Sequence, residues 1–341
     1  MKRSSASSTS MPDYAIIGEH PSVVQLRDLV ARVARSKAGI VLIYGETGSG
    51  KGLVARALHA QSARAQHNFT EINCAAIPGN LLESELFGHE RGAFTGAVDR
   101  KAGLLEIANG GSVFLDEVRE LDPIMQAKIL TLLDSRRFRR IGSVQELTTN
   151  ARFIAATNKI LLSEVSAGRF RDDLYYRLQV VSINIPPLRD RGEDVFVLAD
   201  QFLAKFNALH ESHFSEIEPA VRDIFRRYHW PGNVRELSNL LERICILEEG
   251  TYVRESHLPP RIVREAGAAH LCPIDVQTAP HHMASPGANE GYVAQTARFQ
   301  KALIIRALSD SQGSLSKAGQ ILGLSRHALR HQMNKLGINS P

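Results

Sequence analysis

The chain has 341 residues, of which 43% are hydrophobic and 23% charged, with a formal net charge of +5. This composition is typical of a globular protein, and the length favours two or three domains. It excludes a membrane protein, because no apolar run approaches the ~20 residues of a membrane-spanning helix. The three cysteines, Cys74, Cys245 and Cys272, are odd in number and far apart. They favour a reducing compartment over a disulfide framework, so we expect a cytoplasmic protein.

The N-terminal half alternates between strand and helix patterns. Residues 1–12 are serine-rich and lack the apolar core of a signal peptide, which predicts a disordered tail. A helix is expected over residues 21–34, where apolar side chains share one face. Short apolar strands are expected over residues 40–44, 68–73, 112–115, 152–156 and 180–185. Their apolar runs do not strictly alternate, which predicts a parallel sheet of the α/β class covered on both faces, within a domain spanning residues 13–186.

The C-terminal half is predicted to be helical. Helical patterns over residues 195–209, 218–228 and 233–247 indicate a smaller helical unit within residues 187–264. Residues 265–293 carry Gly, Pro, Ala and His without a period, which indicates a linker. Four side chains there could suggest a metal site, although their spacing fits no compact set and solvated residues are the favoured interpretation: His270, Cys272, His281 and His282. In the final block, residues 294–341, seven Lys and Arg residues stand against Asp310 alone, which suggests binding to nucleic acid.

A glycine-rich loop directly follows the first strand: Gly45, Glu46, Thr47, Gly48, Ser49, Gly50 and Lys51. Strand, loop and helix in this order predict a phosphate-binding P-loop, with the alternative of an ordinary glycine-rich turn. The loop N–H groups and the helix N-terminus would bind phosphate, and Lys51 would reach the β and γ phosphates. The next residue is Gly52 instead of Ser or Thr. The hydroxyl that usually holds Mg²⁺ is therefore missing, and an acid elsewhere must do more of that work.

Two acids end another apolar strand, at Asp116 and Glu117. Beside a P-loop, Asp116 can hold the Mg²⁺ of a bound nucleotide and Glu117 can polarise the attacking water. Asn158 ends a further strand and could sense the γ-phosphate or orient the water. Taken alone, these residues could equally be a solvated acidic strand end and a plain turn residue. Together with the P-loop they indicate hydrolysis of ATP.

Three arginines are candidates for contacting the nucleotide. Arg171 and Arg177 lie six residues apart, and either could stabilise the transition-state charge in a neighbouring subunit. A salt-bridged surface is the alternative for this pair. Arg235 lies in the first turn of a helix for which Asn233 is the predicted N-cap, and it could point back to the nucleotide.

The segment ESELFGHERGAFTGA contains the loop Gly92, Ala93, Phe94, Thr95, Gly96 and Ala97. With this loop, the chain resembles the bacterial enhancer-binding proteins, the AAA+ activators of sigma-54 RNA polymerase. The resemblance covers residues 17–259 and the C-terminal block, and implies that the loop contacts sigma-54 and moves with the nucleotide state. Phe94 is a large apolar group among small residues on a glycine-hinged loop, which suits contact with a partner. A loop tucked under the domain is the alternative.

The resemblance also implies roles for single residues. Asn73 would hold the catalytic Glu117 in an inactive pose, and Thr157 and Asn158 would form the first sensor. Arg171 and Arg177 would act in trans, and Arg235 would be the second sensor. Family members usually carry an acid after the P-loop lysine, and Gly52 departs from that pattern.

The C-terminal block predicts a helix-turn-helix, with helices over residues 316–322 and 325–336 around Gly323. Apolar contacts are expected from Ala318, Ile321, Leu322, Leu324, Leu329 and Met333. The residues left for the DNA groove are Ser325, which also caps the second helix, and Arg326, His327, Arg330, His331 and Lys335. The block resembles the Fis-type domain, in which residues 294–308 would be the first helix and part of a dimer contact; a basic helical bundle is the alternative.

The sequence thus predicts an ATP-driven activator, with ATP and Mg²⁺ as cofactors and double-stranded enhancer DNA and sigma-54 RNA polymerase as partners. We expect a C-terminal dimer, AAA+ domains assembled into a hexameric ring, and no sensory domain before Asp13, so that turnover needs no phosphorylation. Two alternatives remain open. One is a sigma-54-independent DNA-binding regulator that uses nucleotide for assembly, and the other is a generic AAA+ remodeller.

Overall fold

The computed structural model describes residues 14–268 and scattered positions between residues 304 and 333. The chain divides into two compact units, residues 1–273 and residues 274–341. Within the described residues, no helix is long and apolar enough to cross a membrane.

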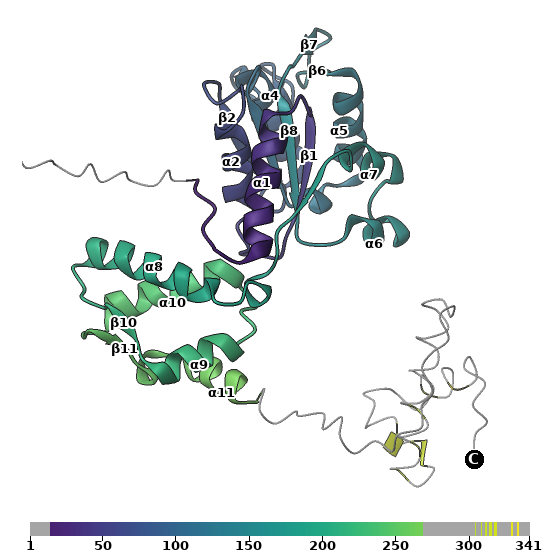
Figure 1. Ribbon diagram of the computed structural model, residues 1–341. Coiled ribbons are helices and arrows are strands. Elements are labelled where there is room, and N and C mark those ends of the chain that lie inside the picture. Colours follow the sequence, from purple (N-terminus) through teal and green to yellow (C-terminus); the bar gives the residue numbers. More distant parts are fainter. Residues whose placement is uncertain are drawn as a thin grey trace, which may run out of the picture. The chain divides into compact units, whose positions relative to one another are not determined.

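A five-stranded parallel sheet in the order β2-β5-β8-β1-β9 forms the centre of the first unit (Figure 1). Its strands are β1 (Ile40–Tyr44), β2 (Phe69–Asn73), β5 (Ser112–Asp116), β8 (Arg152–Thr157) and β9 (Ser182–Asn184). Every pairing between them is parallel. The predicted α/β sheet is confirmed, with each predicted strand in its expected place.

Alternate strand residues face two helical layers. On one face, α1 (Pro21–Arg35) and α2 (Lys51–Ala60) pack against Val41, Ile43 and Phe114. Leu42, Val113 and Leu115 face the other side, which is covered by α3 (Gly79–Phe87), α4 (Leu104–Ile107), α5 (Pro123–Ser135), α6 (Leu161–Ser166) and α7 (Asp172–Leu178). Burial on both faces explains why the strands are apolar throughout.

Two short antiparallel hairpins project from this core. One pairs β3 (Gly88–His89) with β4 (Lys101–Ala102), and the other pairs β6 (Arg137–Arg139) with β7 (Glu146–Thr148). A bridge between His89 and Ile141 joins the two hairpins. The sequence analysis did not predict them, because strands of two or three mostly polar residues leave no hydrophobic period.

The helical unit, or lid, follows β9. It contains η2 (Leu188–Asp190), α8 (Asp194–His210), α9 (Pro219–Arg227), α10 (Asn233–Leu247), η3 (Glu255–His257) and α11 (Pro260–Ala268), with a strand pair of β10 (Glu216–Ile217) and β11 (Tyr252–Val253). The three predicted helices are confirmed. Residues 265–268, predicted as linker, belong to α11, because Ile262 and Ala266 are buried in the lid core.

In the second unit, the described residues include a buried apolar cluster of Ile304, Leu308, Ala318, Leu329 and Met333. Ala318, Leu329 and Met333 are among the predicted contacts of the helix-turn-helix. The residues predicted to face DNA, from Ser325 to Lys335, lie outside the described residues.

Arg152, at the start of β8, is 2% exposed and holds the end of α1. Its guanidinium donates to the carbonyls of Val33 at 2.7 Å and Ala34 at 3.2 Å in the last turn of α1. The carbonyl of Val33 also accepts from the N–H and the hydroxyl of Ser36. We expect Arg152→Met to lower the free energy of unfolding by about 1–3 kcal/mol, because the carbonyl of Ala34 loses the donor it has from Arg152 and that of Val33 loses one of its donors. Urea denaturation followed by circular dichroism measures this. Arg56→Met, which breaks an exposed pair with Glu71, should cost no more than about 1 kcal/mol; equal losses would contradict the assignment.

Candidate nucleotide-binding site

The P-loop joins the carboxyl end of β1 to the start of α2. Gly48 and Gly50 have φ of +77° and +104°, in the left-handed region that glycine alone adopts without strain. Among the described residues, their N–H groups have no acceptor, and the buried hydroxyl of Ser49 has no partner. The loop therefore presents unsatisfied donors at the N-terminus of a ten-residue helix. This arrangement fits the phosphates of a nucleotide.

Lys51 and Glu117 form an ion pair beside the loop. The Nζ of Lys51 lies 3.0 Å from Oε1 of Glu117 and donates to the carbonyl of Gly45 at 3.2 Å. The N–H of Asn158 donates to the other carboxylate oxygen of Glu117 at 3.3 Å. The side-chain amide of Asn158 donates to the hydroxyl of Thr47 at 3.2 Å, while its Oδ1 is buried without a partner among the described residues. The structure thus brings these predicted site residues together at one edge of the sheet.

Asn73 ends β2 in register with Asp116, so it lies at the same edge. Its Oδ1 accepts a hydrogen bond from the N–H of Ala75 at 2.9 Å. The carboxylate of Glu117 contacts Lys51 and Asn158, and not Asn73 as predicted. Thr157 is fully buried, and its hydroxyl donates to the carbonyl of Lys159 at 3.3 Å.

Asp116 is a partly buried carboxylate at the end of β5. Burial raises the pKa of Asp116, Lys51 opposes that effect, and Glu117 adds to it. A Cβ at Gly52 would meet only Glu71 and Phe114, both at 3.9 Å, so this position contributes no ligand atom. Asp116 is therefore the residue best placed to hold a hard divalent cation next to the P-loop.

Two residues of the lid form hydrogen bonds with the side chain of Glu46. Arg189 forms two hydrogen bonds with its carboxylate, at 2.6 and 2.8 Å, and the Nδ2 of Asn233 donates to it at 3.1 Å. These contacts lower the pKa of Glu46 to about 2, the hydrogen bond from Arg189 being the largest cause. The prediction that Asn233 caps α10 is wrong. The N-cap is Gly232, and the Oδ1 of Asn233 accepts from the N–H of Leu188 at 2.8 Å.

Arg235 lies in the first turn of α10, as predicted. Its backbone N–H donates to the carbonyl of Gly48 at 3.2 Å. Its exposed side chain lines a cavity of about 610 Å³ together with Thr47 and Gly232. The predicted second sensor therefore stands beside the P-loop.

A second cavity, of about 480 Å³, adjoins the other side of the loop at Gly50. Its walls are mainly apolar and include Ile16, Ile17, Leu53 and Phe202. The sequence analysis missed this pocket. The signal that would have found it is the apolar pair Ile16-Ile17 ahead of α1, which the helical pattern leaves unassigned.

The loop of residues 92–97 is carried by the hairpin of β3 and β4. The N–H of Gly92 donates to the carbonyl of Ala97 at 2.8 Å, which closes the loop. Phe94 is 39% exposed. The centroids of its ring and the His89 ring are 5.0 Å apart in an edge-to-face arrangement. The aromatic side chain is thus partly shielded on one side and open to a partner on the other.

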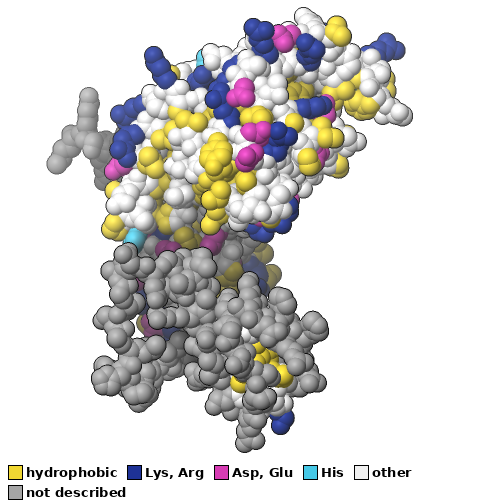
Figure 2. Space-filling view, turned by 90° about the vertical axis from the view of Figure 1, so that its right-hand side faces the viewer, with side chains coloured by type: hydrophobic (Ala, Val, Ile, Leu, Met, Phe, Trp, Pro, Cys, Tyr) yellow, Lys and Arg dark blue, Asp and Glu magenta, His cyan; other side chains and the backbone are white. Residues whose placement is uncertain are grey.

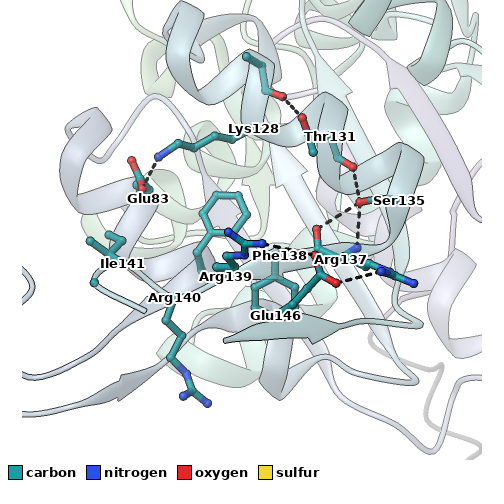
Figure 3. A pocket seen from close by; sticks show the side chains of 13 residues that line it. Glu83, Lys128, Thr131, Ser135, Arg137, Phe138, Arg139, Arg140, Ile141 and Glu146 are labelled. Atoms are coloured by element: carbon teal, nitrogen blue, oxygen red, sulfur yellow. Dashed lines mark hydrogen bonds and ion pairs between the residues drawn. The ribbon is translucent and has the colours of Figure 1, made fainter. Parts of the chain in front are cut away.

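The base of this loop is braced by the neighbouring hairpin. Arg140 is 7% exposed and contacts Glu90 at 2.8 Å and Glu106 at 2.5 Å. A cavity of about 1040 Å³ lies under the same hairpin (Figure 3). Lys128 reaches Glu83 at 2.5 Å across it, and Arg137 pairs with Glu146 at 2.9 Å. This larger cavity is separate from the P-loop residues.

Arg171 and Arg177 lie at the two ends of α7. Arg171 pairs with Asp173 at 2.7 Å, and Arg177 with Asp134 at 2.9 Å. Neither has a hydrogen bond or ion pair to the described P-loop residues of its own chain. The structure therefore does not bring them into the site that the other predicted residues form.

The candidate linker metal ligands, from His270 to His282, lie outside the described residues. Within the described residues, no group of three or more potential ligands could hold a metal ion. Cys74 and Cys245 are buried free thiols.

A parallel sheet with a P-loop on β1, an acid pair on β5 and a helical lid defines an AAA+ ATPase domain. Residues 16–184 match the sigma-54 interaction domain, residues 189–271 the AAA+ ATPase lid domain, and residues 295–336 the Fis family of bacterial regulatory proteins. The chain belongs to the family of AAA+ sigma-54-dependent transcriptional regulators. Its AAA+ domain binds ATP, and its C-terminal block is a Fis-type helix-turn-helix domain.

Several known proteins are similar over most of the chain. The regulatory protein AtoC of Escherichia coli (strain K12) is 41% identical over 334 residues, 98% of this chain and 70% of AtoC. The transcriptional regulatory protein ZraR of Salmonella typhimurium is 41% identical over 328 residues, 96% of this chain and 70% of ZraR. The crystal structure of NtrX from Brucella abortus in complex with ATP is 32% identical, with a TM-score of 0.66, and the match covers 94% of this chain and 69% of NtrX.

The raised pKa of Asp116 predicts a pH-dependent cost of keeping this acid charged without a cation. Because its pKa is higher in the folded than in the unfolded protein, stability falls as pH rises through the interval between the two values. We expect Asp116→Asn to raise the melting temperature of the nucleotide-free protein by a few degrees at pH 7.5, and by less near pH 4. Melting curves at several pH values measure this. An equal shift at every pH would contradict the assignment.

Proposed function

We propose that this chain couples ATP hydrolysis to the conversion of a closed sigma-54 RNA polymerase promoter complex into the open form. The observation that carries the proposal is the gathering of Lys51, Glu117 and Asn158 around the P-loop, in the domain that also presents the loop of residues 92–97. The C-terminal domain would meanwhile bind upstream enhancer DNA as a dimer.

Asp116 would hold Mg²⁺ next to the phosphates. Its carboxylate is partly buried at the carboxyl edge of the sheet, and Gly52 offers no hydroxyl to share the task. Oxygen ligands of this kind suit Mg²⁺. Such an ion would neutralise charge that develops on the transferred phosphoryl group.

Lys51 and Glu117 exchange partners when nucleotide binds. The ammonium of Lys51 is paired with Glu117. Phosphate oxygens compete for the same ammonium, so binding frees Glu117 to accept a proton from the attacking water. Asn158 is placed to orient that water, because its backbone N–H donates to Glu117 and its side-chain amide donates to Thr47. The apolar cavity beside Gly50, with Ile17 and Phe202 in its walls, would take the base.

Arg171 and Arg177 would complete the site of a neighbouring subunit. Both are substantially exposed, at 47% and 41% of their side chains. Figure 2 views the side of the core where α5, α6 and α7 lie, and it shows hydrophobic side chains interspersed with charged ones. Ile124, Ile160 and Tyr176 on these elements are each more than 65% exposed. Such a surface favours packing against another copy, and a head-to-tail contact repeated by rotation closes a ring, which we expect to be a hexamer.

The loop of residues 92–97 would contact sigma-54. Phe94 offers an exposed aromatic surface on a loop that is anchored at its base, which is the character of an interface anchor. Hydrolysis would move this loop against the partner. Neither alternative, a sigma-54-independent regulator or a generic remodeller, accounts for the presence of this loop.

Replacing the catalytic acid should separate binding from hydrolysis. We expect Glu117→Gln to bind ATP but to lower turnover by about 10²–10⁴-fold, because the proton acceptor is lost. Lys51→Ala should weaken ATP binding itself. Phosphate release and fluorescent-nucleotide titration measure the two effects. Glu120→Gln, on an exposed neighbouring acid, should leave both unchanged, and full turnover in Glu117→Gln would refute the assignment.

Mixing experiments test whether the arginines act in trans. Arg177→Ala and Glu117→Gln should each be inactive alone. In an equal mixture, up to about a quarter of the wild-type turnover should return, because about one interface in four then combines an intact Glu117 with an intact Arg177. A mixture as inactive as its components would place the arginine in its own subunit's site.

The overall function is tested by promoter melting. The full chain, ATP and sigma-54 RNA polymerase are combined on a supercoiled template that bears a sigma-54 promoter. We expect melting that requires hydrolysable ATP and is lost in Phe94→Ala and in Thr95→Ala. ATP turnover without melting would favour the sigma-54-independent regulator, and DNA-independent unfolding of a model protein would favour the generic remodeller.

A further inference from the structure

Three consecutive P-loop carbonyls are each held by a donor from the lid. The carbonyl of Thr47 accepts from Nδ2 of Asn233 at 3.1 Å, and that of Gly48 from the N–H of Arg235 at 3.2 Å. The carbonyl of Ser49 accepts from Nη2 of Arg191 at 3.2 Å. All three donors lie more than 140 residues along the chain from their acceptors.

These contacts fix the direction of the loop's peptide dipoles. A peptide N–H and its C=O point in opposite directions, so lid donors that hold the carbonyls of Thr47 and Ser49 leave the N–H groups of Gly48 and Gly50 available to phosphate. The N–H of Ser49 donates instead to the carbonyl of Glu46 at 3.1 Å. A glycine-rich loop has little conformational preference of its own, and Gly48 and Gly50 can rotate freely when unrestrained. The lid therefore supplies an order that the loop sequence lacks.

The lid residues are built for this contact. Asn233 is fully buried and has φ of +50°, a strained conformation for a residue other than glycine. Arg191 is 4% exposed and also donates to the carbonyl of Pro186 at 2.8 Å. A Cβ at Gly48 would lie 2.1 Å from the carbonyl oxygen of Gly232, so the two backbones touch with no room for a side chain.

Charge at this contact is balanced. Glu46 places a carboxylate beside the phosphate site, where it would repel a nucleotide. Arg189 neutralises it with two hydrogen bonds, at 2.6 and 2.8 Å. The ion pair thus connects the loop to the lid, and it also removes the repulsion between Glu46 and a bound phosphate.

We propose that Arg191 and Asn233 are positioning residues that set nucleotide affinity by holding the P-loop carbonyls, without touching the nucleotide. If the lid moved away from the core, the P-loop carbonyls would lose these hydrogen bonds and the nucleotide would bind less tightly. The inference rests on the ATP site and is independent of sigma-54. It deepens the proposed function, because it makes the lid part of phosphate binding.

The test measures the affinity of the full chain for fluorescent ADP. Arg191→Lys keeps the charge but loses the forked donor, and Asn233→Gly keeps the positive φ but loses the amide. We expect each to weaken ADP binding at least about tenfold. Arg254→Met, which breaks an exposed lid pair with Glu218, should bind ADP as the wild type does. Variants that melt as the wild type does and bind ADP within twofold of it would overturn the proposal.

Hydrogen exchange gives a second readout that does not depend on the variants folding. Linkage requires that ADP strengthen the same contacts, so ADP should slow amide exchange in residues 188–191 and 232–235 of the wild type as well as in the P-loop. Protection of the P-loop alone would overturn the proposal. Failure of the wild type to bind ADP would instead refute the nucleotide site itself, and normal ADP binding without promoter melting would affect only the proposed function.

Discussion

The site depends on one constraint, the direction of the peptide groups between β1 and α2. A phosphate is bound there only if the N–H groups converge, and a glycine-rich loop does not converge unaided. The sheet fixes one end of the loop, because β1 lies between β8 and β9 with both faces buried. Helix α2 fixes the other end through Val54 and Leu58, which are in the core. The lid donors at Thr47, Gly48 and Ser49 order what remains.

The P-loop lysine also contacts Glu117, the proposed catalytic acid. Under the proposed function, phosphate oxygens would compete with Glu117 for the ammonium of Lys51, which lies 3.0 Å from that carboxylate. Glu117 has φ of +52°, outside the usual range for a glutamate, and the N–H of Asn158 helps hold it there. The acid thus lies next to the P-loop with both carboxylate oxygens engaged. The proposed exchange of partners would be an electrostatic competition.

Local sequence patterns predicted the strands, the lid helices and the P-loop, because these features depend on residues that are close in the chain. The runs at β1, β5 and β8 are apolar because both sheet faces are covered, and the helices of the lid show their period. The P-loop and Asp116-Glu117 were found because they follow strands directly. The role of Asn233 was misjudged, because its partner Thr47 lies 186 residues away and an asparagine at a helix start resembles a cap. The contacts of Arg191 and the apolar cavity lined by Phe202 were not predicted for the same reason, since tertiary contacts leave no periodic signal in the sequence.

A continuous stretch of chain connects Asn73, which pairs in register with Asp116, to the loop of residues 92–97. Asn73 stands beside Asp116 at the edge of the sheet, and the chain turns directly from it into α3. Helix α3 is anchored by buried Leu82 and Leu86 and ends where β3 begins the stem of the loop. A displacement of Asn73 would therefore be carried as a shift of α3, because a packed helix moves as a unit. Under the proposed function, a change at Asn73 would reach Phe94 along this path.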